Sequence, residues 1–229
     1  MNKTIIIIGG STGIGKALVE EAAKEPSNKI VAFARKDDLM RENFKALDNV
    51  STYHLDLEFF DEKKISDAIA NIGEIDILIN NAGYLVKNNF DKLSHEDLLK
   101  SYQINVIGIM QAVQVIIPKM NPNGSHIVNI SSMGGFQGSV KFPGLTAYST
   151  SKAALCSFTE LFAEEYKDSG IKMNCLCLGA VQTEMLEKAF PGYESGITTK
   201  EMASFIVTFV SSTINLVNGQ VIRVAKSNP

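Results

Sequence analysis

Short apolar runs alternate along the chain with longer amphipathic stretches. The runs are rich in β-branched residues, and unbroken apolar runs of this length are typical of strands that are buried on both faces of a parallel sheet. We predict strands over Thr4–Ile8, Ile30–Ala34, Val50–Leu55, Ile75–Ile79, Ser125–Ile130, Lys172–Leu178 and Gln220–Val224. Helical patterns lie between them, around Gly15–Lys24, Glu62–Asn71, Ser94–Ile117, Ala147–Lys167 and Thr199–Ser211.

This alternation predicts the fold class. Strand, helix and strand in repetition indicate an α/β fold, with a doubly wound and mostly parallel sheet of seven strands flanked by helices. A length of 229 residues suits one domain. Neither an internal repeat nor a Pro/Gly/Ser-rich linker divides the chain, so we expect a single domain over residues 1–229.

Composition and charge exclude several partners. Hydrophobic residues make up 45% of the chain and charged residues 21%, which is typical of a globular protein. A net charge of −3 gives no electrostatic reason to expect a nucleic acid or an anionic membrane as partner. The apolar run Ile5–Ile8 is too short for a signal-peptide core or a spanning helix, so we expect a cytoplasmic protein.

The three cysteines do not have the spacing of a disulfide framework. Cys175 and Cys177 alternate along a predicted strand and therefore point to one face, and with Cys156 they are interpreted as buried free thiols. The three histidines are scattered, and none has ligand spacing from another histidine or a cysteine. We therefore expect no metal site.

A glycine-rich turn follows the first predicted strand directly and opens a predicted helix. Glycines allow a tight turn close to a pyrophosphate, and the helix N-terminus offers free N–H groups and the positive end of its dipole. A strand before the turn and a helix after it are the context that a dinucleotide-binding Rossmann fold requires. The residues expected to contact the cofactor here are Gly9, Ser11, Thr12, Gly13, Ile14 and Gly15.

The spacing of these glycines resembles the TGxxxGxG turn of short-chain dehydrogenases/reductases, with Ile8 in place of the leading threonine. Further motifs similar to that family follow in order along the whole chain. They are Asp56 after the third strand, Asn80-Asn81-Ala82-Gly83, Asn105 in the long helix, Ser132, Tyr148-x-x-x-Lys152, and Asn174 through Thr183 with Leu178 where proline is usual. The resemblance implies an NAD(P)-binding catalytic domain with further cofactor contacts from Asp56, Leu57, Asn81, Ala82, Gly83, Tyr148, Lys152, Val181 and Thr183.

Tyr148 and Lys152 lie four residues apart in a predicted helix, so their side chains share one face. A tyrosine hydroxyl ordinarily titrates near about 10, and an ammonium within about 4–6 Å lowers that pKa. The resemblance implies that Tyr148 is the general acid/base, that Ser132 hydrogen-bonds the reacting oxygen, that Lys152 lowers the tyrosine pKa and holds the nicotinamide ribose, and that Asn105 anchors a relay water. The alternatives are an incidental Tyr/Lys pair and, for the neighbouring Ser131, a structural serine.

The end of the second predicted strand bears on the choice of cofactor. NAD-binding enzymes usually place an acidic residue there, but this chain has Ala34, followed by Arg35. A guanidinium suits the 2′-phosphate of NADP(H), which we therefore expect to be favoured over NAD(H). Against this, many NADP-binding relatives carry a second basic residue where this chain has Thr12, and Arg35 as a solvated surface charge is the alternative.

The resemblance implies an NADP(H)-dependent reductase of a small or medium carbonyl compound, or its reverse on an alcohol. A 3-oxoacyl-carrier-protein reductase, an NAD-dependent alcohol dehydrogenase and a non-catalytic NADP-binding sensor are the other hypotheses. In relatives the helices corresponding to Ser94–Ile117 and Ala147–Lys167 pair across a two-fold axis, so we also expect a homodimer or homotetramer.

Overall fold

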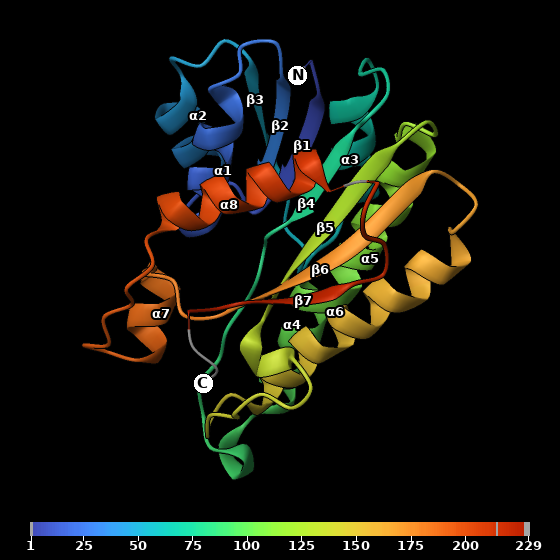
Figure 1. The fold of residues 1–229 in the computed structure, drawn as a ribbon. Helices are drawn as coiled ribbons and strands as arrows, with labels where there is room; N and C mark the ends of the chain where they lie inside the picture. Colours follow the sequence, from blue (N-terminus) through green and yellow to red (C-terminus); the bar gives the residue numbers. More distant parts are fainter. Residues whose placement is uncertain (1, 214, 227–229) are drawn as a thin grey trace.

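A seven-stranded parallel sheet forms the centre of the molecule, with helices on both faces (Figure 1). The computed structural model describes residues 2–213 and 215–226. The strand order is β3-β2-β1-β4-β5-β6-β7, and every neighbouring pair is parallel. The strands are β1 (Thr4–Ile8), β2 (Lys29–Ala34), β3 (Val50–His54), β4 (Ile77–Asn80), β5 (Ser125–Ser132), β6 (Ile171–Leu178) and β7 (Val221–Val224). The predicted fold class is confirmed.

The helices divide between the two faces of the sheet. They are α1 (Gly13–Ala23), α2 (Asp37–Phe44), α3 (Glu62–Ile69), α4 (His95–Tyr102), α5 (Gly108–Ile116), α6 (Thr146–Glu165), α7 (Glu184–Ala189) and α8 (Thr199–Ser212). Buried residues of α1, α2 and α8 pack together with one face of the sheet, and those of α3, α5 and α6 with the other. None of the helices within residues 2–213 and 215–226 is long and apolar enough to span a membrane.

Strand β1 shows why the sequences of the strands are unbroken apolar runs. Ile5 and Ile7 belong to the core on one face, while Ile6 and Ile8 belong to the core on the other. All four are at most 2% exposed. Because successive side chains point to opposite faces, a strand covered on both sides needs an apolar residue at every position.

The sequence prediction missed two helices and one irregularity. Helices α2 and α7 are short and polar, so neither carries a long apolar period. The predicted helix Ser94–Ile117 is interrupted by a π-helical segment at Gln103–Ile107, between α4 and α5. Short π-helical segments inside α-helices are frequent at functional sites.

Buried polar side chains tie the sheet to its helices. His126 on β5 is fully buried, and its Nδ1 lies 3.3 Å from the backbone oxygen of Val210 in α8. Its Nε2 lies 2.9 Å from Nδ2 of Asn174 on β6. A neutral ring that donates from Nδ1 and accepts at Nε2 satisfies both contacts. Burial lowers the pKa of His126 to about 4, although the hydrogen bond to Val210 opposes the shift.

This burial predicts a loss of stability in mild acid. The folded-state pKa of about 4 lies below the ordinary value of 6.5, so the unfolded chain takes up the proton first as the pH falls. The stabilisation is complete above pH 6.5 and is lost as the pH falls toward 4. Between pH 7 and 5 the free energy of unfolding should fall by about 2 kcal/mol through this group.

The measurement is urea unfolding at both pH values for the wild type and for His126→Gln, whose uncharged side chain still accepts a hydrogen bond. The variant should be less stable at pH 7 but should lose less stability on acidification. An equal loss in both proteins would contradict the prediction, because the exposed groups that titrate are common to both.

Candidate active site

The turn between β1 and α1 has no room for a side chain at Gly9 or Gly15. A Cβ atom on Gly9, whose φ is +93°, would lie 2.6 Å from the backbone nitrogen of Ala82. A Cβ atom on Gly15 would lie 1.8 Å from the carbonyl oxygen of Gly9. The oxygen of Ile8 accepts hydrogen bonds from the backbone nitrogens of Asn81 (2.9 Å) and Ala82 (2.8 Å). The predicted glycine turn and the loop after β4 are therefore packed against one another.

The N-terminus of α1 is open to an anion. Its N-cap residue Thr12 has an extended backbone and makes no side-chain capping hydrogen bond, and the first turn contains no acidic residue. The methyl group of Thr183, at the start of α7, lies 3.5 Å from the position of a Cβ atom on Gly13. A glycine cradle below an uncapped helix terminus fits the pyrophosphate of a dinucleotide. Ser11 and Ile14 are partly exposed in the same turn, and Val181 is buried before α7.

Arg35 follows β2 at the same edge of the sheet and is exposed. Among the ion pairs of the described residues none involves Arg35, whereas the neighbouring carboxylates are engaged elsewhere. Asp37 is paired with Arg41 and lies 3.2 Å from Nδ1 of His54, and Asp38 lies 3.5 Å from Arg41. The guanidinium of Arg35 is therefore available to a ligand.

Asp56 lies just beyond β3 and is half-buried, with Oδ1 accepting a hydrogen bond of 2.9 Å from the backbone nitrogen of Glu58. Leu57 is buried, and its carbonyl oxygen accepts a hydrogen bond of 3.0 Å from Nε2 of Gln103 in the π-helical segment. The strand order β3-β2-β1 brings these residues to the same edge of the sheet as the glycine turn.

Two neighbouring serines at the end of β5 have different environments. Ser132 forms a side-chain hydrogen bond with Tyr148 and accepts another, of 3.1 Å, from the backbone nitrogen of Gly134. Ser131 is buried, and its hydroxyl donates to the carbonyl oxygen of Lys152 at 2.8 Å. Alternation along the strand separates the two side chains. Ser132 is thus the serine beside the tyrosine, and Ser131 supports the helix.

The side chains of Lys152 and Asn105 both lie next to Gly83. Lys152 is 3% exposed, and its Nζ donates to the carbonyl oxygen of Ile130 at 2.8 Å. A Cβ atom on Gly83 would lie 3.5 Å from Nζ of Lys152 and 3.6 Å from Oδ1 of Asn105. The Asn105 side chain accepts from the backbone nitrogen of Tyr84 at 2.7 Å and donates to the oxygens of Tyr84 and Ser151, both at 2.9 Å. Asn105 therefore joins the loop after β4 to α6, a role its sequence position did not reveal.

Comparison with known proteins agrees with this arrangement. A family model described as short chain dehydrogenase matches residues 3–194. The chain belongs to the short-chain dehydrogenase family.

Its relatives include oxidoreductase UcpA of Salmonella typhimurium, 34% identical over 195 residues, which cover 81% of this chain and 72% of UcpA. The 3-oxoacyl-[acyl-carrier-protein] reductase FabG of Thermotoga maritima is 30% identical over 97% of this chain and 96% of its own. Among solved structures, "ElxO with NADP Bound" matches 98% of both chains with a TM-score of 0.84 and 27% identity.

Burial controls the charges in this short-chain dehydrogenase. Burial lowers the pKa of Lys152 to about 8, while the nearby sulfur atoms of Cys175, Cys156 and Cys177 oppose that shift. Burial also raises the pKa of Tyr148, and the hydrogen bond with Ser132 opposes that shift. Desolvation of the phenolate therefore sets the net direction for Tyr148 in the protein alone, and the lowering of its pKa by Lys152 stays a prediction.

The segment after β6 of this short-chain dehydrogenase contacts the loop that leads into α6. The rings of Phe142 and Phe190 have centroids 5.9 Å apart and meet edge to face. Nζ of Lys87 lies 4.2 Å from the centroid of Phe190 and donates to the carbonyl oxygen of Ala189 at 2.7 Å. Phe142, Lys87 and Phe190 come from three segments distant in the chain, and their spacing in the sequence does not predict that they meet.

Proposed function

We propose that the chain is an NADP(H)-dependent oxidoreductase that transfers hydride between the nicotinamide and a small or medium carbonyl or alcohol substrate. The observation that carries the proposal is the convergence of Ser132, Tyr148 and Lys152 at the carboxyl end of β5. The glycine turn lies at the same edge of the sheet, two strands away through β4. Family membership over residues 3–194 supports the same class of reaction. We propose further that residues 1–229 act as one catalytic domain.

Several groups are proposed to hold the dinucleotide. The turn residues Gly9, Ser11, Thr12, Gly13, Ile14 and Gly15 would surround the pyrophosphate at the N-terminus of α1. The family resemblance assigns the remaining contacts to Arg35, Asp56, Leu57, Asn81, Ala82, Gly83, Tyr148, Lys152, Val181 and Thr183. When bound, the nicotinamide supplies the hydride in the reductive direction and accepts it in the oxidative direction.

Tyr148 is proposed to deliver the proton to the carbonyl oxygen. Ser132 accepts from Gly134, which leaves its own hydroxyl proton free to donate to that oxygen and to stabilise developing negative charge. With a pKa of about 8, Lys152 is mostly protonated at neutral pH. Its Nζ donates to Ile130 and has further N–H groups for the nicotinamide ribose. Asn105 is proposed to position Lys152 through its hydrogen bonds with Tyr84 and Ser151. The water that Asn105 would anchor as a proton relay stays a prediction.

The preference for NADP(H) is supported by the free guanidinium of Arg35 and by the pairing of Asp37 and Asp38 with Arg41. Ala34 is apolar where a carboxylate would repel a 2′-phosphate. A charge-assisted hydrogen bond contributes about 1.5–3 kcal/mol, which corresponds to roughly ten- to a hundredfold in affinity.

A second candidate, 3-oxoacyl-carrier-protein reductase, is favoured by the likeness to FabG over nearly the whole of both chains. An acidic carrier needs basic groups near the entrance. Lys87 and Lys141 lie on the loops around Phe142, although each is held by backbone oxygens of its neighbours. An NAD-dependent alcohol dehydrogenase and a non-catalytic sensor have no comparable support. We propose a small-molecule carbonyl or alcohol compound as the substrate. The cytoplasmic location stays a prediction.

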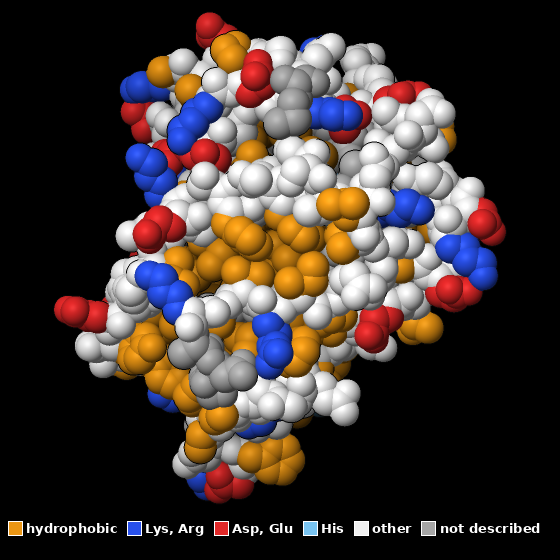
Figure 2. Space-filling view, viewed as in Figure 1, with side chains coloured by type: hydrophobic (Ala, Val, Ile, Leu, Met, Phe, Trp, Pro, Cys, Tyr) orange, Lys and Arg blue, Asp and Glu red, His pale blue; other side chains and the backbone are white. Residues whose placement is uncertain are grey.

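A homodimer through α4 and α6 is proposed, because the surface there is apolar. Exposed apolar side chains on α4, the π-helical segment and α6 are Leu99 (57% exposed), Tyr102 (37%), Ile107 (45%) and Leu161 (63%). Figure 2 shows a second band of apolar side chains between α8 and β7. Val207 of α8 and Ile222 and Val224 of β7 are partly buried apolar residues packed against the core. A homotetramer would use both surfaces.

The first test of this function is Tyr148→Phe. Only the hydroxyl carries the proton, so turnover should fall by at least about 100-fold while the affinity for NADPH stays within about threefold. The substrate for the assay comes from a panel of carbonyl compounds, including an acetoacetyl thioester, screened with NADPH and NADH. Ser131→Ala and Ser132→Ala are the matched pair, of which only Ser132→Ala should lower the rate about as steeply. A near wild-type rate in Tyr148→Phe would refute the mechanism.

Cofactor preference is tested by Arg35→Ala, with the adjacent exposed cation in Lys36→Ala as control. The wild type should bind NADPH at least about tenfold more tightly than NADH. Arg35→Ala should weaken NADPH by a similar factor and leave NADH almost unchanged, since NADH offers no 2′-phosphate. Fluorescence titration gives all the affinities. Equal losses for both cofactors, or the same loss in Lys36→Ala, would identify Arg35 as a surface charge only.

Assembly is tested by Leu161→Glu, with Phe205→Glu on α8 and Phe59→Glu beyond β3 as comparisons. A carboxylate buried in the α6 interface is unpaired, so Leu161→Glu should give monomers where the wild type gives oligomers. Phe205→Glu should reduce a tetramer to dimers, and Phe59→Glu should change nothing. Light scattering at micromolar concentration measures the mass. A monomeric wild type would end the proposal.

A further inference from the structure

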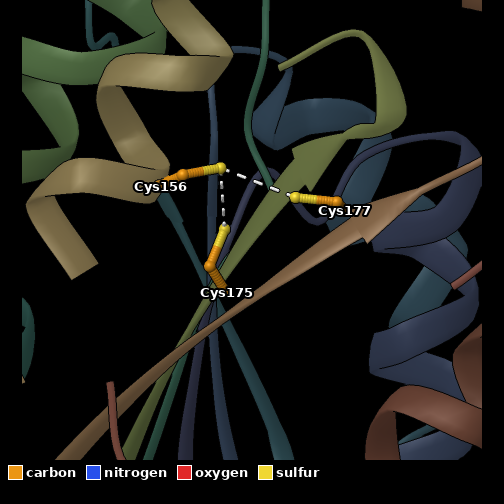
Figure 3. Close-up of side chains that lie close together, drawn as sticks. All are labelled: Cys156, Cys175 and Cys177. Atoms are coloured by element: carbon orange, nitrogen blue, oxygen red, sulfur yellow. Dashed lines mark hydrogen bonds between the residues drawn. The ribbon is translucent and has the colours of Figure 1, made fainter. Parts of the chain in front are cut away.

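The three cysteines of the chain meet at one point between α6 and β6 (Figure 3). Sγ of Cys156 on α6 lies 3.8 Å from Sγ of Cys175 and 3.5 Å from Sγ of Cys177, both on β6. All three sulfur atoms lie within 4.8 Å of one another, and the thiols are free and buried. Cys175 and Cys177 share the face of β6 that α6 covers, and Cys156 points at both of them.

We propose that these three thiols bind one thiophilic metal ion, Zn²⁺ or Cu(I), as thiolate ligands. A Zn–S bond of about 2.3 Å with tetrahedral angles sets sulfur atoms about 3.8 Å apart. The separations of 3.8 Å and 3.5 Å from Sγ of Cys156 lie close to that value, so the ion would fit with small rotations of the side chains. Soft thiolate ligands select these two ions over Mg²⁺ or Ca²⁺.

The two ions differ in what they need besides the sulfurs. Zn²⁺ prefers four ligands, and the hydroxyl oxygen of Ser131, 3.4 Å from Sγ of Cys156, is proposed as the fourth. Cu(I) is satisfied by three sulfur ligands. The shared chemistry is therefore a three-thiolate site, and the fourth ligand distinguishes the occupants.

An ion could reach the cluster only past the residues that cover it, Met133, Phe136 and Val221. Met133 is buried against it, while Phe136 and Val221 are only partly buried there. Arg223 lies over the Phe136 ring, with its guanidinium carbon 5.3 Å from the ring centroid. The ion would therefore enter while the chain folds or when Phe136 moves. The carbonyl oxygen of Lys152 lies 3.3 Å from Sγ of Cys156, so the site lies directly beneath the helical turn that carries the proposed catalytic lysine.

The test measures metal retained by the whole folded chain. Reduced protein, stripped with a chelator, is given Zn²⁺ or Cu(I) in separate samples, both when native and when refolded with the ion, and excess ion is removed by gel filtration. About one ion per chain is expected in at least one arm, determined by elemental analysis. Co²⁺ replaces Zn²⁺ as a spectroscopic probe, because thiolate ligands give it intense near-ultraviolet charge-transfer bands.

The variants are Cys175→Ser and the double variant Cys156→Ser/Cys177→Ser, with Met173→Leu as matched control. Met173 lies on the same face of β6, is fully buried and carries a sulfur that is not a thiol. Met173→Leu should retain about one ion per chain, whereas the cysteine variants should retain at least about tenfold less. Circular dichroism verifies that each variant is folded. Retention only after refolding supports the site and identifies its cover as the barrier.

Less than about one ion per ten chains in every wild-type arm would overturn the proposal, and this outcome does not depend on any variant folding. Equal retention by wild type and the folded double variant would also overturn it, since the ion would then lie elsewhere.

Discussion

The close packing of α6 against β5 and β6 is the contact on which the whole site depends. A Cβ atom on Gly135 would lie 2.6 Å from the carbonyl carbon of Lys152, so the loop after β5 touches the backbone of the helix. Ser131 donates to the Lys152 carbonyl oxygen from the strand itself. One turn of α6 is thereby fixed from below, and Tyr148 and Lys152 are held against Ser132 and Ile130.

Buried amides extend this constraint across the sheet. Asn80 on β4 donates to Oδ1 of Asn129 on β5 at 2.8 Å, and Asn129 donates to Oγ1 of Thr159 on α6 at 2.9 Å. Each of these groups would be costly to bury without its partner, so together they specify how β4, β5 and α6 align. The alignment matters because β4 leads to the loop at Gly83, which faces Lys152.

The same packing explains the electrostatics of the site. Burial beneath the loops and helices favours the neutral forms of Tyr148 and Lys152, raising one pKa and lowering the other. The pKa values of the hydroxyl and the ammonium, 10.0 and 10.5 for the free side chains, are thus moved apart. The thiols beneath α6 act on Lys152 in the opposite direction to burial, so the cysteine cluster and the proposed catalytic lysine share one electrostatic environment.

The sequence by itself determined the fold class, the glycine turn and the order of the motifs. These depend on local pattern: an apolar residue at every strand position when both faces are buried, as in Ile5–Ile8, and glycine where backbone meets backbone, as at Gly9. Only the tertiary structure decided the rest. The π-helical turn at Asn105 differs from a regular helix by one residue. Two contacts join residues that are distant in the chain: Phe142 with Phe190, and Cys156 with Cys175 and Cys177. Spacing along a sequence carries no record of such contacts, because they are set by how elements pack across the sheet.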